Sequence, residues 1–383
     1  MKRLLFFVES LSGGGAERVL VTLLRHLDVN KYRITLLTLV DVGVLKGEID
    51  LKRVNYLTVI RPSSNPLVSL WNKGKYKLIC SFLPCPFVSK CIIPQKGIDL
   101  YIAFTEGFAT KIISYAPGSK LAWVHSDLKD YPWTQDKHIY RNLGEETSVY
   151  RKFNHVICVS ESVERTMRAR YGLTHTRTIL NPIDTQEIKA LASLTNGEVL
   201  PSNHFRIVSV GRLIYQKGYD ELIPLIGRLR DHQMDVSLFL IGEGEERARL
   251  ERITEECHLS GTVFFLGYRK NPYALMSQMD LFVCSSRAEG FSLVVAEALT
   301  LGIPVISMTC SGPDRLLDGG KYGVLCDNFD ELYLAMEKAV TDSGYLDQLR
   351  EKARNRSGFF NIQESLRQVE DLFDATICPP SVS

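Results

Sequence analysis

Short runs of apolar residues alternate along the chain with segments in which apolar residues recur every three or four positions. The runs have the length of buried strands, and the periodic segments have the pattern of amphipathic helices. Strands and helices alternate in this way in parallel sheets that helices cover on both faces. The pattern predicts an α/β protein with doubly wound parallel sheets and strands at 3–8, 32–39, 99–104, 121–125, 155–160, 206–210, 236–241, 263–266, 281–284 and 305–308.

The chain is long enough for two domains. Its 383 residues exceed the roughly 250–300 at which a single hydrophobic core stops growing. The strand and helix pattern pauses in a stretch rich in Gly, Pro, Asn and Ser, and it begins again at residue 206. We therefore expect an N-terminal domain over 1–184, a linker over 185–204 and a C-terminal domain over 205–361.

Composition and charge narrow the class of protein. Hydrophobic residues make up 45% and charged residues 23%, as in ordinary globular proteins, and a net charge of +2 argues against a nucleic-acid binder. The nine cysteines are odd in number and form no CxxC, so we expect reduced core residues in a cytosolic protein. No apolar run reaches the ~18 residues of a spanning helix. The first run stops at Glu9, so it predicts a strand and not a signal peptide.

Two carboxylates flank the predicted strand–loop–helix stretch within 279–306. Glu289 lies in the loop after the strand, and Glu297 lies eight positions later, inside the helix. Both are expected at the carboxyl end of a parallel strand, where such sheets bind ligands. Carboxylates accept hydrogen bonds from vicinal hydroxyls, so the pair suits two diols. If the helix begins at Ser292, the amides of Gly290, Phe291 and Ser292 form an anion or hydroxyl site beside them.

Glycines and cations follow other predicted strands. Gly14 and Gly15 stand between the first strand and its helix, where they let the backbone approach a ligand. Dinucleotide oxidoreductases also have a glycine-rich first turn, but the spacing here is not GxGxxG. Arg212 and Lys217 lie between a strand and a helix, so both can reach one diphosphate. Three further glycines end strands and suit close backbone contact with a nucleotide: Gly211, Gly242 and Gly244.

Four stretches together resemble the retaining GT-B glycosyltransferases of family four. In chain order they are Ser-Gly-Gly-Gly-Ala-Glu-Arg, Trp-Val-His-Ser-Asp-Leu, Gly-Arg-Leu-x-x-Gln-Lys-Gly and Glu-Gly-Phe-Ser-(x)4-Glu. The resemblance covers nearly the whole chain and implies two Rossmann-like domains facing a central cleft. It also implies that a C-terminal helix at about 362–378 packs back on the N-terminal, acceptor-side domain. Pro182 stands where the family often has Gly, which is expected to stiffen the hinge.

The resemblance also implies roles for individual residues. Glu289 would hold the donor sugar's hydroxyls, Glu297 the nucleotide ribose, and His125 would lie beside the reacting carbon. Tyr268 would lie near the base, and the segment 126–152 would line the acceptor channel. The expected catalytic residues are His125, Arg212, Lys217 and Glu289. The expected donor-binding residues are Gly14, Gly15, Gly211, Gly242, Gly244, Tyr268, Gly290, Phe291, Ser292, Leu293 and Glu297.

The expected reaction is the retaining transfer of a hexose from a nucleotide-sugar, most commonly a UDP-sugar among such relatives. The acceptor would be a glycan, carried on a polyprenyl diphosphate, in the synthesis of bacterial surface polysaccharide such as capsule or O-antigen. No Asp-x-Asp triplet occurs, so no metal and no cofactor is expected. Two alternatives remain open. One is another enzyme on the GT-B frame, a sugar-nucleotide epimerase or a phosphorylase, and the other is a catalytically silent subunit that binds the nucleotide-sugar.

The segment 51–98 has an unusual composition. It contains eight Lys and Arg residues and no Asp or Glu, and aromatic residues are interleaved with the cations. This composition suits an anionic membrane surface. The alternative is a solvated helix face whose charge is balanced elsewhere in the fold. We therefore expect a cytoplasmic protein that contacts the inner face of the cell membrane through 51–98.

Overall fold

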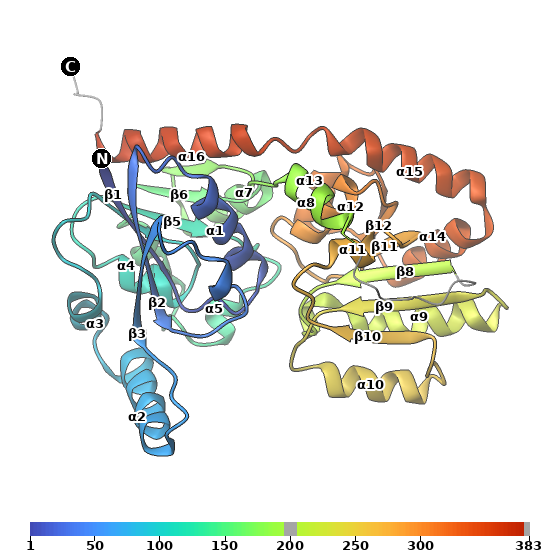
Figure 1. Cartoon of the computed structure of the whole chain (residues 1–383), viewed down its shortest axis with the longest axis horizontal. Coiled ribbons are helices and arrows are strands. Elements are labelled where there is room, and N and C mark those ends of the chain that lie inside the picture. Colours follow the sequence, from blue (N-terminus) through green and yellow to red (C-terminus); the bar gives the residue numbers. More distant parts are fainter. Residues whose placement is uncertain (195–204, 379–383) are drawn as a thin grey trace. The chain divides into compact units, whose positions relative to one another are not determined.

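The structure, a computed structural model, describes residues 1–194 and 205–378. The chain divides into two compact units, Met1–Pro182 with Gln363–Ser383 and Ile183–Ile362. Each unit is a parallel sheet between layers of helices (Figure 1). Within the described ranges, no helix is both long enough and apolar enough to cross a membrane.

The described residues of the first unit form a seven-stranded sheet in the order β3-β2-β1-β4-β5-β6-β7, and every pairing is parallel. Its apolar strand residues are buried because helices cover both faces. The strands are β1 Lys2–Val8, β2 Tyr32–Val40, β3 Val54–Ile60, β4 Leu100–Ala103, β5 Lys120–Val124, β6 His155–Cys158 and β7 Thr176–Thr178. The helices are α1 Gly15–His26, η1 Lys46–Glu48, α2 Pro66–Lys77, η2 Leu78–Phe82, α3 Cys85–Ile92, α4 Phe108–Ile113, α5 Trp133–Asp136, α6 Leu143–Tyr150 and α7 Glu161–Tyr171.

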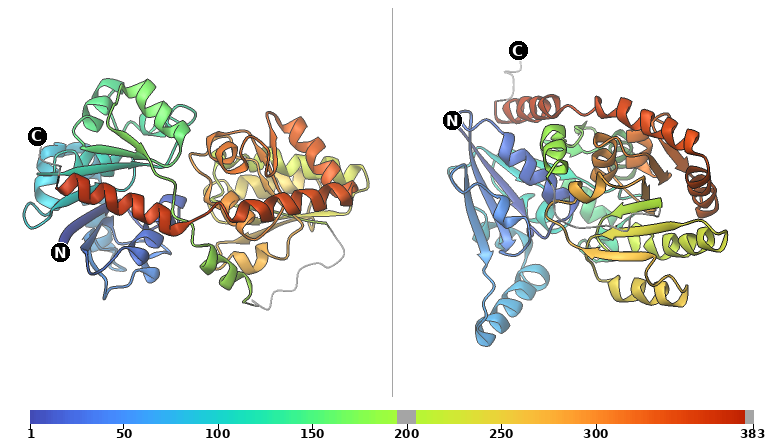
Figure 2. Two further views of the ribbon diagram at one scale, coloured as in Figure 1. Left: turned by 90° about the horizontal axis from the view of Figure 1, so that it is seen from above. Right: turned by 45° about the vertical axis from the view of Figure 1, so that its right-hand side comes forward.

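The last helix, α16 (Ile362–Ile377), packs on the sheet of the first unit. The ring of Phe373 meets the rings of Phe6 and Tyr32 edge-on, each with centroids 6.1 Å apart. Lys31 Nζ lies 2.8 Å from Glu370 Oε2, which joins the same helix to the turn before β2. Figures 1 and 2 show α16 lying along this unit. The C-terminal helix is therefore part of the first unit, although more than 180 residues separate it from the other elements there.

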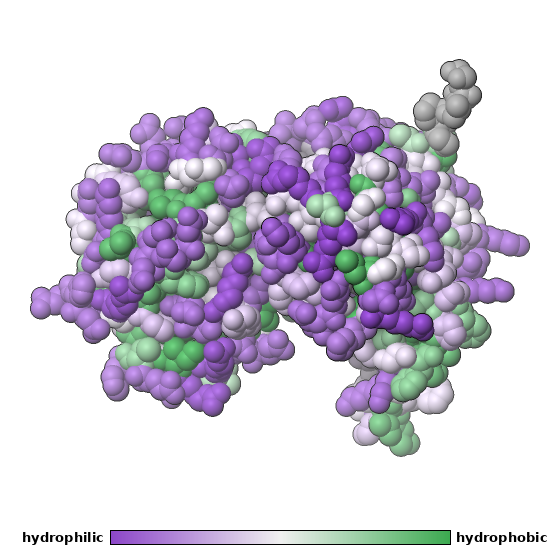
Figure 3. Space-filling view, turned by 180° about the vertical axis from the view of Figure 1, so that it is seen from behind, coloured by the Kyte–Doolittle hydropathy of each residue, from purple (hydrophilic) through white to green (hydrophobic). Residues whose placement is uncertain are grey.

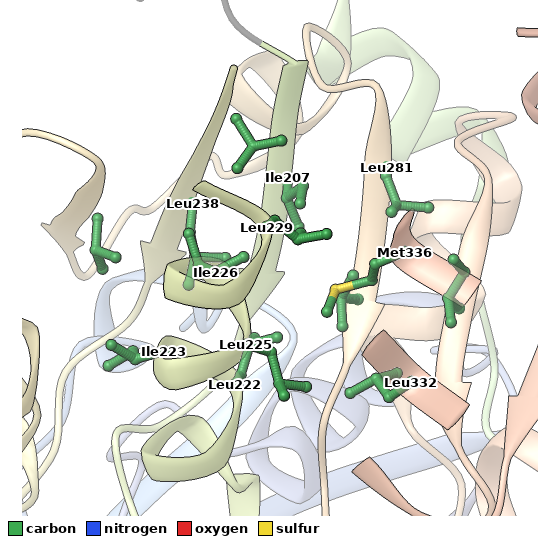
Figure 4. Close-up of a cluster of buried hydrophobic side chains, with 14 of the residues drawn as sticks. Ile207, Leu222, Ile223, Leu225, Ile226, Leu229, Leu238, Leu281, Leu332 and Met336 are labelled. Atoms are coloured by element: carbon green, nitrogen blue, oxygen red, sulfur yellow. The ribbon is translucent and has the colours of Figure 1, made fainter. Parts of the chain in front are cut away.

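The described part of the second unit forms a six-stranded parallel sheet in the order β10-β9-β8-β11-β12-β13. Helix α9 packs on it through Leu222, Ile226 and Leu229, which lie against Ile207 and Leu238 (Figure 4). The strands are β8 Phe205–Val210, β9 Val236–Ile241, β10 Val263–Gly267, β11 Leu281–Cys284, β12 Val305–Met308 and β13 Val324–Cys326. The helices are α8 Thr185–Ala192, η3 Tyr215–Lys217, α9 Tyr219–Asp231, α10 Arg247–Glu256, α11 Tyr273–Met276, α12 Leu293–Thr300, α13 Ser311–Leu317, α14 Phe329–Thr341 and α15 Ser343–Ser357.

The segment 185–204, which we expected to be a linker, begins as a helix. Asp184 caps α8 by accepting a hydrogen bond from the amide of Glu187. Helix α8 packs against α11 and α12, and the side-chain amide of Asn271 donates to the carbonyl of Leu191 at 2.8 Å. The division between units accordingly falls at Pro182/Ile183, and α8 belongs to the second unit. The remaining linker residues, 195–204, lie outside the described residues.

Replacing Phe373 by Ala should destabilise the first unit. Phe373 is fully buried, and loss of a buried phenyl ring costs about 3–5 kcal/mol. The three tryptophans of the chain, Trp71, Trp123 and Trp133, all lie in the first unit, so their emission during urea unfolding reports that unit alone. The matched control is the exposed ring of Phe82, whose replacement should shift the free energy of unfolding by under ~0.5 kcal/mol. Equal effects of the two substitutions would show that α16 does not stabilise this unit.

Candidate active site

The predicted site residues of the second unit gather at one edge of its sheet. The neighbouring strands β9, β8 and β11 end at Ile241, Val210 and Cys284, and the loops that follow carry the predicted residues. The strand order reverses between β8 and β11, so this edge holds the switch point at which α/β sheets bind ligands. Residues far apart in the sequence therefore meet because their strands are neighbours.

Glycines allow the loops at this edge to touch backbone to backbone. A Cβ at Gly242, whose φ is +148°, would lie 2.0 Å from the carbonyl oxygen of Gly211. A Cβ at Gly244 would lie 2.3 Å from the carbonyl oxygen of Leu213. Neither distance is possible in a folded protein. The predicted glycines Gly211, Gly242 and Gly244 therefore belong to one tightly packed group of loops.

The structure brings Lys217 and Glu289 together. Lys217 Nζ lies 2.5 Å from Glu289 Oε1, and Ser286 Oγ donates to the same oxygen at 2.8 Å. The loops that carry them are joined by main-chain and side-chain contacts, with the Arg287 amide donating to the Gln216 carbonyl at 2.8 Å. Burial opposes the charge on Lys217, but the nearby Glu289 carboxylate outweighs it and raises the pKa of the lysine. The ammonium is therefore charged at neutral pH.

Arg212 stands apart from this pair. Its side chain is exposed, and among the described residues it contacts no carboxylate. Gly218, just after Lys217, has a φ of +66°, and a Cβ there would lie 2.2 Å from the Ser285 carbonyl oxygen. The chain thus turns sharply after Lys217. The two cations share one loop, but Lys217 is engaged by Glu289 while Arg212 remains available to an anion.

The helix predicted after the Glu289 loop is present as α12. Ser292 takes the N-cap position with a φ of +66°, and its buried hydroxyl finds no hydrogen-bond partner among the described residues. The helix begins at Leu293, one position after the predicted start. The chain packs closely here, because a Cβ at Gly312 would lie 2.5 Å from the carbonyl carbon of Phe291. Gly290 and Phe291 are buried beside the free amides of the helix terminus.

Glu297 is held inside α12. The hydroxyl of Tyr273, on α11, donates to Glu297 Oε1 at 2.9 Å, and the glutamate is almost fully buried. Tyr268 follows β10 at the same edge of the sheet, and its hydroxyl is buried without a partner among the described residues. Glu297 is therefore bound by a tyrosine hydroxyl inside the unit, whereas Glu289, in the loop after β11, is bound by Lys217 and Ser286.

In the first unit, His125 directly follows β5, one residue beyond the strand that was predicted to include it, and it contacts an acid that the sequence analysis missed. The amide of His125 donates to Glu106 Oε2 at 3.1 Å, and its Nε2 lies 2.9 Å from the Phe104 carbonyl oxygen. A carbonyl only accepts, so Nε2 carries the proton and Nδ1 is the acceptor in the neutral ring. Burial lowers the pKa of His125, against the opposing effects of Glu106 and the Phe104 bond. The ring is neutral at pH 7.

Glu9 is a second acid that sequence reasoning passed over. It follows β1, and the amides of Phe108 and Ala109 donate to its carboxyl group. Burial, opposed by those two hydrogen bonds and aided by the nearby Glu17 and Glu106, raises the pKa of Glu9 to about 7. Glu9, Glu106 and His125 each follow one of the adjacent strands β1, β4 and β5. The sequence did contain a signal for both acids, because each closely follows a short apolar run that forms a buried strand.

The glycine loop is close to these acids. Helix α1 begins at Gly15, and Gly14 takes its N-cap position with an extended backbone. A Cβ at Gly14 would lie 2.4 Å from Glu17 Oε2, so the carboxylate of Glu17 folds back over the loop. No group of three or more His, Cys, Asp or Glu side chains in the described part of the chain is arranged to hold a metal ion.

Comparisons with known proteins agree with this arrangement. The family profile "Glycosyltransferase Family 4" matches residues 13–187, and "Glycosyl transferases group 1" matches 194–356. The chain belongs to the family-four glycosyltransferases. A relative from Campylobacter jejuni, N-acetylgalactosamine-N,N'-diacetylbacillosaminyl-diphospho-undecaprenol 4-alpha-N-acetylgalactosaminyltransferase, is 26% identical and covers 94% of this chain and 96% of its own. The lipopolysaccharide core biosynthesis glycosyltransferase LpsE of Rhizobium meliloti is 27% identical over 64% of this chain and 67% of its own.

Solved structures show the same fold. The HepE protein of Anabaena in complex with UDP and glucose superposes with a TM-score of 0.75, at 21% identity over 98% of this chain and 100% of its own. WaaG, a glycosyltransferase of lipopolysaccharide biosynthesis, has a TM-score of 0.67 at 15% identity over 97% of this chain and 99% of its own. The two Rossmann-like parallel-sheet units are thus those of a GT-B glycosyltransferase.

The raised pKa of Glu9 predicts a pH-dependent effect of Glu9→Gln on stability. In the unfolded chain Glu9 ionises near pH 4.5, but in the folded unit it ionises near pH 7, so ionisation opposes folding across this window. Glutamine can still accept from the Phe108 and Ala109 amides, but it cannot ionise. The variant should gain roughly 3 kcal/mol relative to wild type at pH 8 and little at pH 4.5. Urea unfolding followed by tryptophan emission measures this difference, and the same difference at both pH values would contradict it.

Proposed function

We propose that the protein is a retaining glycosyltransferase that moves a hexose from a nucleotide-sugar, in particular a UDP-sugar, to a glycan. The observation that carries the proposal is the contact of Lys217 with Glu289 at the switch point of the second sheet, together with the exposed Arg212 in the same loop as Lys217. The location supports a bound nucleotide, the cations suit its diphosphate, and the carboxylate suits a sugar. The UDP named with the solved structure of HepE supports the same donor.

Each charged group has a separate task in this proposal. When the bond between sugar and diphosphate breaks, negative charge grows on the departing phosphate, and Arg212 and Lys217 stabilise it. Glu289 Oε1 is already bound by Lys217 and Ser286, which fixes the carboxylate. Its other oxygen then accepts hydrogen bonds from hydroxyls of the donor sugar. Side-chain cations supply the positive charge, so the proposed reaction uses neither a metal nor a cofactor.

Retention is assigned to attack from the face that the diphosphate leaves. The departing phosphate oxygen takes the proton of the acceptor hydroxyl as the new bond forms, so no carboxylate nucleophile is required. The neutral ring of His125 has Nδ1 as an acceptor, and we assign it to a hydroxyl of the donor sugar near the reacting carbon. In this proposal neither Glu289 nor His125 bonds covalently to a sugar.

Replacing Arg212 by Ala or Glu289 by Ala should in each case lower kcat about 100-fold or more, the scale of losing one hydrogen-bonding group that stabilises the transition state. The assay is UDP release from a panel of UDP- and GDP-sugars, with and without glycan acceptors. The matched controls are Arg252→Ala and Glu255→Ala, because both residues are exposed on α10, away from the loops of the site. Near-normal turnover in Arg212→Ala or Glu289→Ala would contradict the assignment.

The same assay separates the alternative functions. A sugar-nucleotide epimerase would convert the UDP-sugar without any acceptor, and a silent subunit would bind UDP without turning over any sugar. Transfer to an acceptor with retained anomeric configuration, read by nuclear magnetic resonance of the product, is the expected outcome. A product of inverted configuration would contradict the proposed mechanism.

We propose that the acceptor glycan is carried by a polyprenyl diphosphate and that α2, η2 and α3 dock on the membrane that holds it, at its cytoplasmic face. Helix α2 has no buried residue, and Leu67, Leu70 and Trp71 expose 78%, 69% and 73% of their surface. A 12-residue helix without a packed face is marginal in water. Figure 1 shows α2 projecting beyond the sheet of its unit, and Figure 3 shows hydrophobic side chains on the projection.

Charge on the same surface favours an anionic membrane. Lys73, Lys77 and Lys90 are exposed there, and no Asp or Glu occurs between residues 51 and 98. Among the described residues these lysines form no ion pair with a carboxylate. The ammonium group of Lys77 lies over the ring of Phe82. Each cation near an anionic surface contributes about 1 kcal/mol of attraction. Exposed aromatic and aliphatic side chains beside unpaired lysines are the composition of a peripheral membrane site. The diphospho-undecaprenol in the name of the Campylobacter relative points to the same kind of acceptor.

The charge-reversed variant Lys73→Glu/Lys77→Glu should bind vesicles of phosphatidylcholine and phosphatidylglycerol at least about 10-fold more weakly than wild type. Co-sedimentation measures the binding, and vesicles of phosphatidylcholine alone should retain little of either protein. The variant Leu70→Ser/Trp71→Ser should also lose binding, whereas Leu334→Ser, which changes an equally exposed leucine on α14, should not. Equal sedimentation of all these proteins would exclude this surface from membrane binding.

A further inference from the structure

The indole of Trp133 is held over Gly107 at the edge of the first sheet. Gly107 has a φ of +86°, and a Cβ there would lie 2.7 Å from Cη2 of Trp133. The hydroxyl of Tyr140 donates to the Gly107 carbonyl at 3.0 Å and fixes this turn. Only glycine at 107 leaves room for the ring, so the backbone is adapted to the position of the indole.

A buried carboxylate joins Trp133 to the residue nearest the proposed chemistry. Glu106 is only 3% exposed. Its Oε1 accepts a long hydrogen bond of 3.4 Å from Trp133 Nε1, and its Oε2 accepts from the amide of His125 at 3.1 Å. Glu106 therefore ties the indole to the end of β5. Glu106 and His125 lie at the same edge of the sheet because β4 and β5 are neighbours, and Trp133 follows β5 at the start of α5.

The environment of Trp133 differs from that of a core tryptophan. Trp123, on β5, is 0% exposed and packs between the rings of Phe104 and His125. Trp133 is only half-buried, although several groups fix its position. An ordered, partly exposed indole beside polar groups matches a pyranose, whose C–H face stacks on the ring while its hydroxyls reach polar neighbours.

We propose that Trp133 is the stacking platform for the terminal sugar of the acceptor glycan, and that Glu106 is the residue that positions it. This inference rests on the proposed glycosyl transfer. It assigns Trp133 to the acceptor and not to the donor, because the cations and glycine turns that suit the nucleotide belong to the second unit. Within the first unit, the indole is linked through Glu106 to His125, the group assigned to the reacting sugar.

The KM values for the two substrates test the assignment, because the loss of Trp133 should change the KM for the acceptor alone. Trp133→Ala should raise the KM for the acceptor about 2- to 12-fold, the range for loss of an aromatic stacking contact, with the KM for the UDP-sugar unchanged. Trp133→Phe keeps a ring and should lie between wild type and Trp133→Ala. Gly107→Ala displaces the indole without removing it and should reproduce the effect of Trp133→Ala. Unfolding followed by circular dichroism identifies any variant that fails to fold, and Trp133→Phe is the variant that keeps an aromatic ring and most of the volume.

A binding measurement tests the subsite without turnover. In a Trp71→Phe background the remaining tryptophans are the fully buried Trp123 and the half-buried Trp133. The probes are methyl glycosides of glucose, galactose, N-acetylglucosamine and N-acetylgalactosamine. At least one should change the emission of the Trp71→Phe protein and leave Trp71→Phe/Trp133→Phe unaffected. A response that persists without Trp133, or no response to any of the four, would overturn the proposal.

The two proposals fail in different ways. If no UDP- or GDP-sugar is bound or turned over, the proposed transferase function is wrong. If transfer proceeds and the Trp133 variants keep the wild-type KM for the acceptor, only the stacking platform is wrong. A rise in the KM for the UDP-sugar alone would instead place Trp133 at the donor and overturn the assignment to the acceptor.

Discussion

The candidate site depends on the ion pair between Lys217 and Glu289, two side chains that are 72 positions apart and largely removed from water. Removing charges from water is costly, so such a pair persists only where geometry and further hydrogen bonds compensate. Here Ser286 also binds the carboxylate, and the Ser285 hydroxyl donates to the Lys217 carbonyl. The glycine turns make this possible, because their backbones pack too closely for any side chain. As a result, the Glu289 carboxylate is fixed in place, and Arg212 remains available to bind an anion.

The two units have the same sheet architecture but carry different functional groups at the corresponding edge. Each is a parallel sheet whose strand order reverses beside its first strand, and in each the functional residues follow neighbouring strands at that point. In the second unit the loops contribute Arg212 and Lys217, which suit an anionic leaving group. In the first unit they contribute Glu9, Glu106 and a neutral His125, which suit hydroxyl groups. The cations proposed for the diphosphate and the acids around His125 are therefore built on separate sheets.

Two parts of the first unit keep apolar surface exposed without belonging to its core. Helix α2 has no packed face, so its leucines and Trp71 stabilise nothing within the unit. Trp133, in contrast, is held by Gly107 and Glu106 but remains half-buried. The difference fits the two proposed partners. A membrane accepts many orientations of a loosely attached helix, whereas a sugar ring requires an indole in one fixed place.

The sequence by itself determined the alternation of strands and helices, because each buried strand is a short apolar run and each helix has its own periodicity. It also determined the loops at Gly211, Gly242 and Glu289, because glycine, lysine and glutamate directly after such runs are local signals. Only the tertiary structure decided that Lys217 binds Glu289 and leaves Arg212 exposed, and that α8 replaces the start of the linker. It also decided that Glu106 accepts from the His125 amide and that Glu9 and Glu106 follow adjacent strands. These outcomes depend on which strands become neighbours and on how closely their loops pack. No local sequence pattern predicts strand order or loop packing.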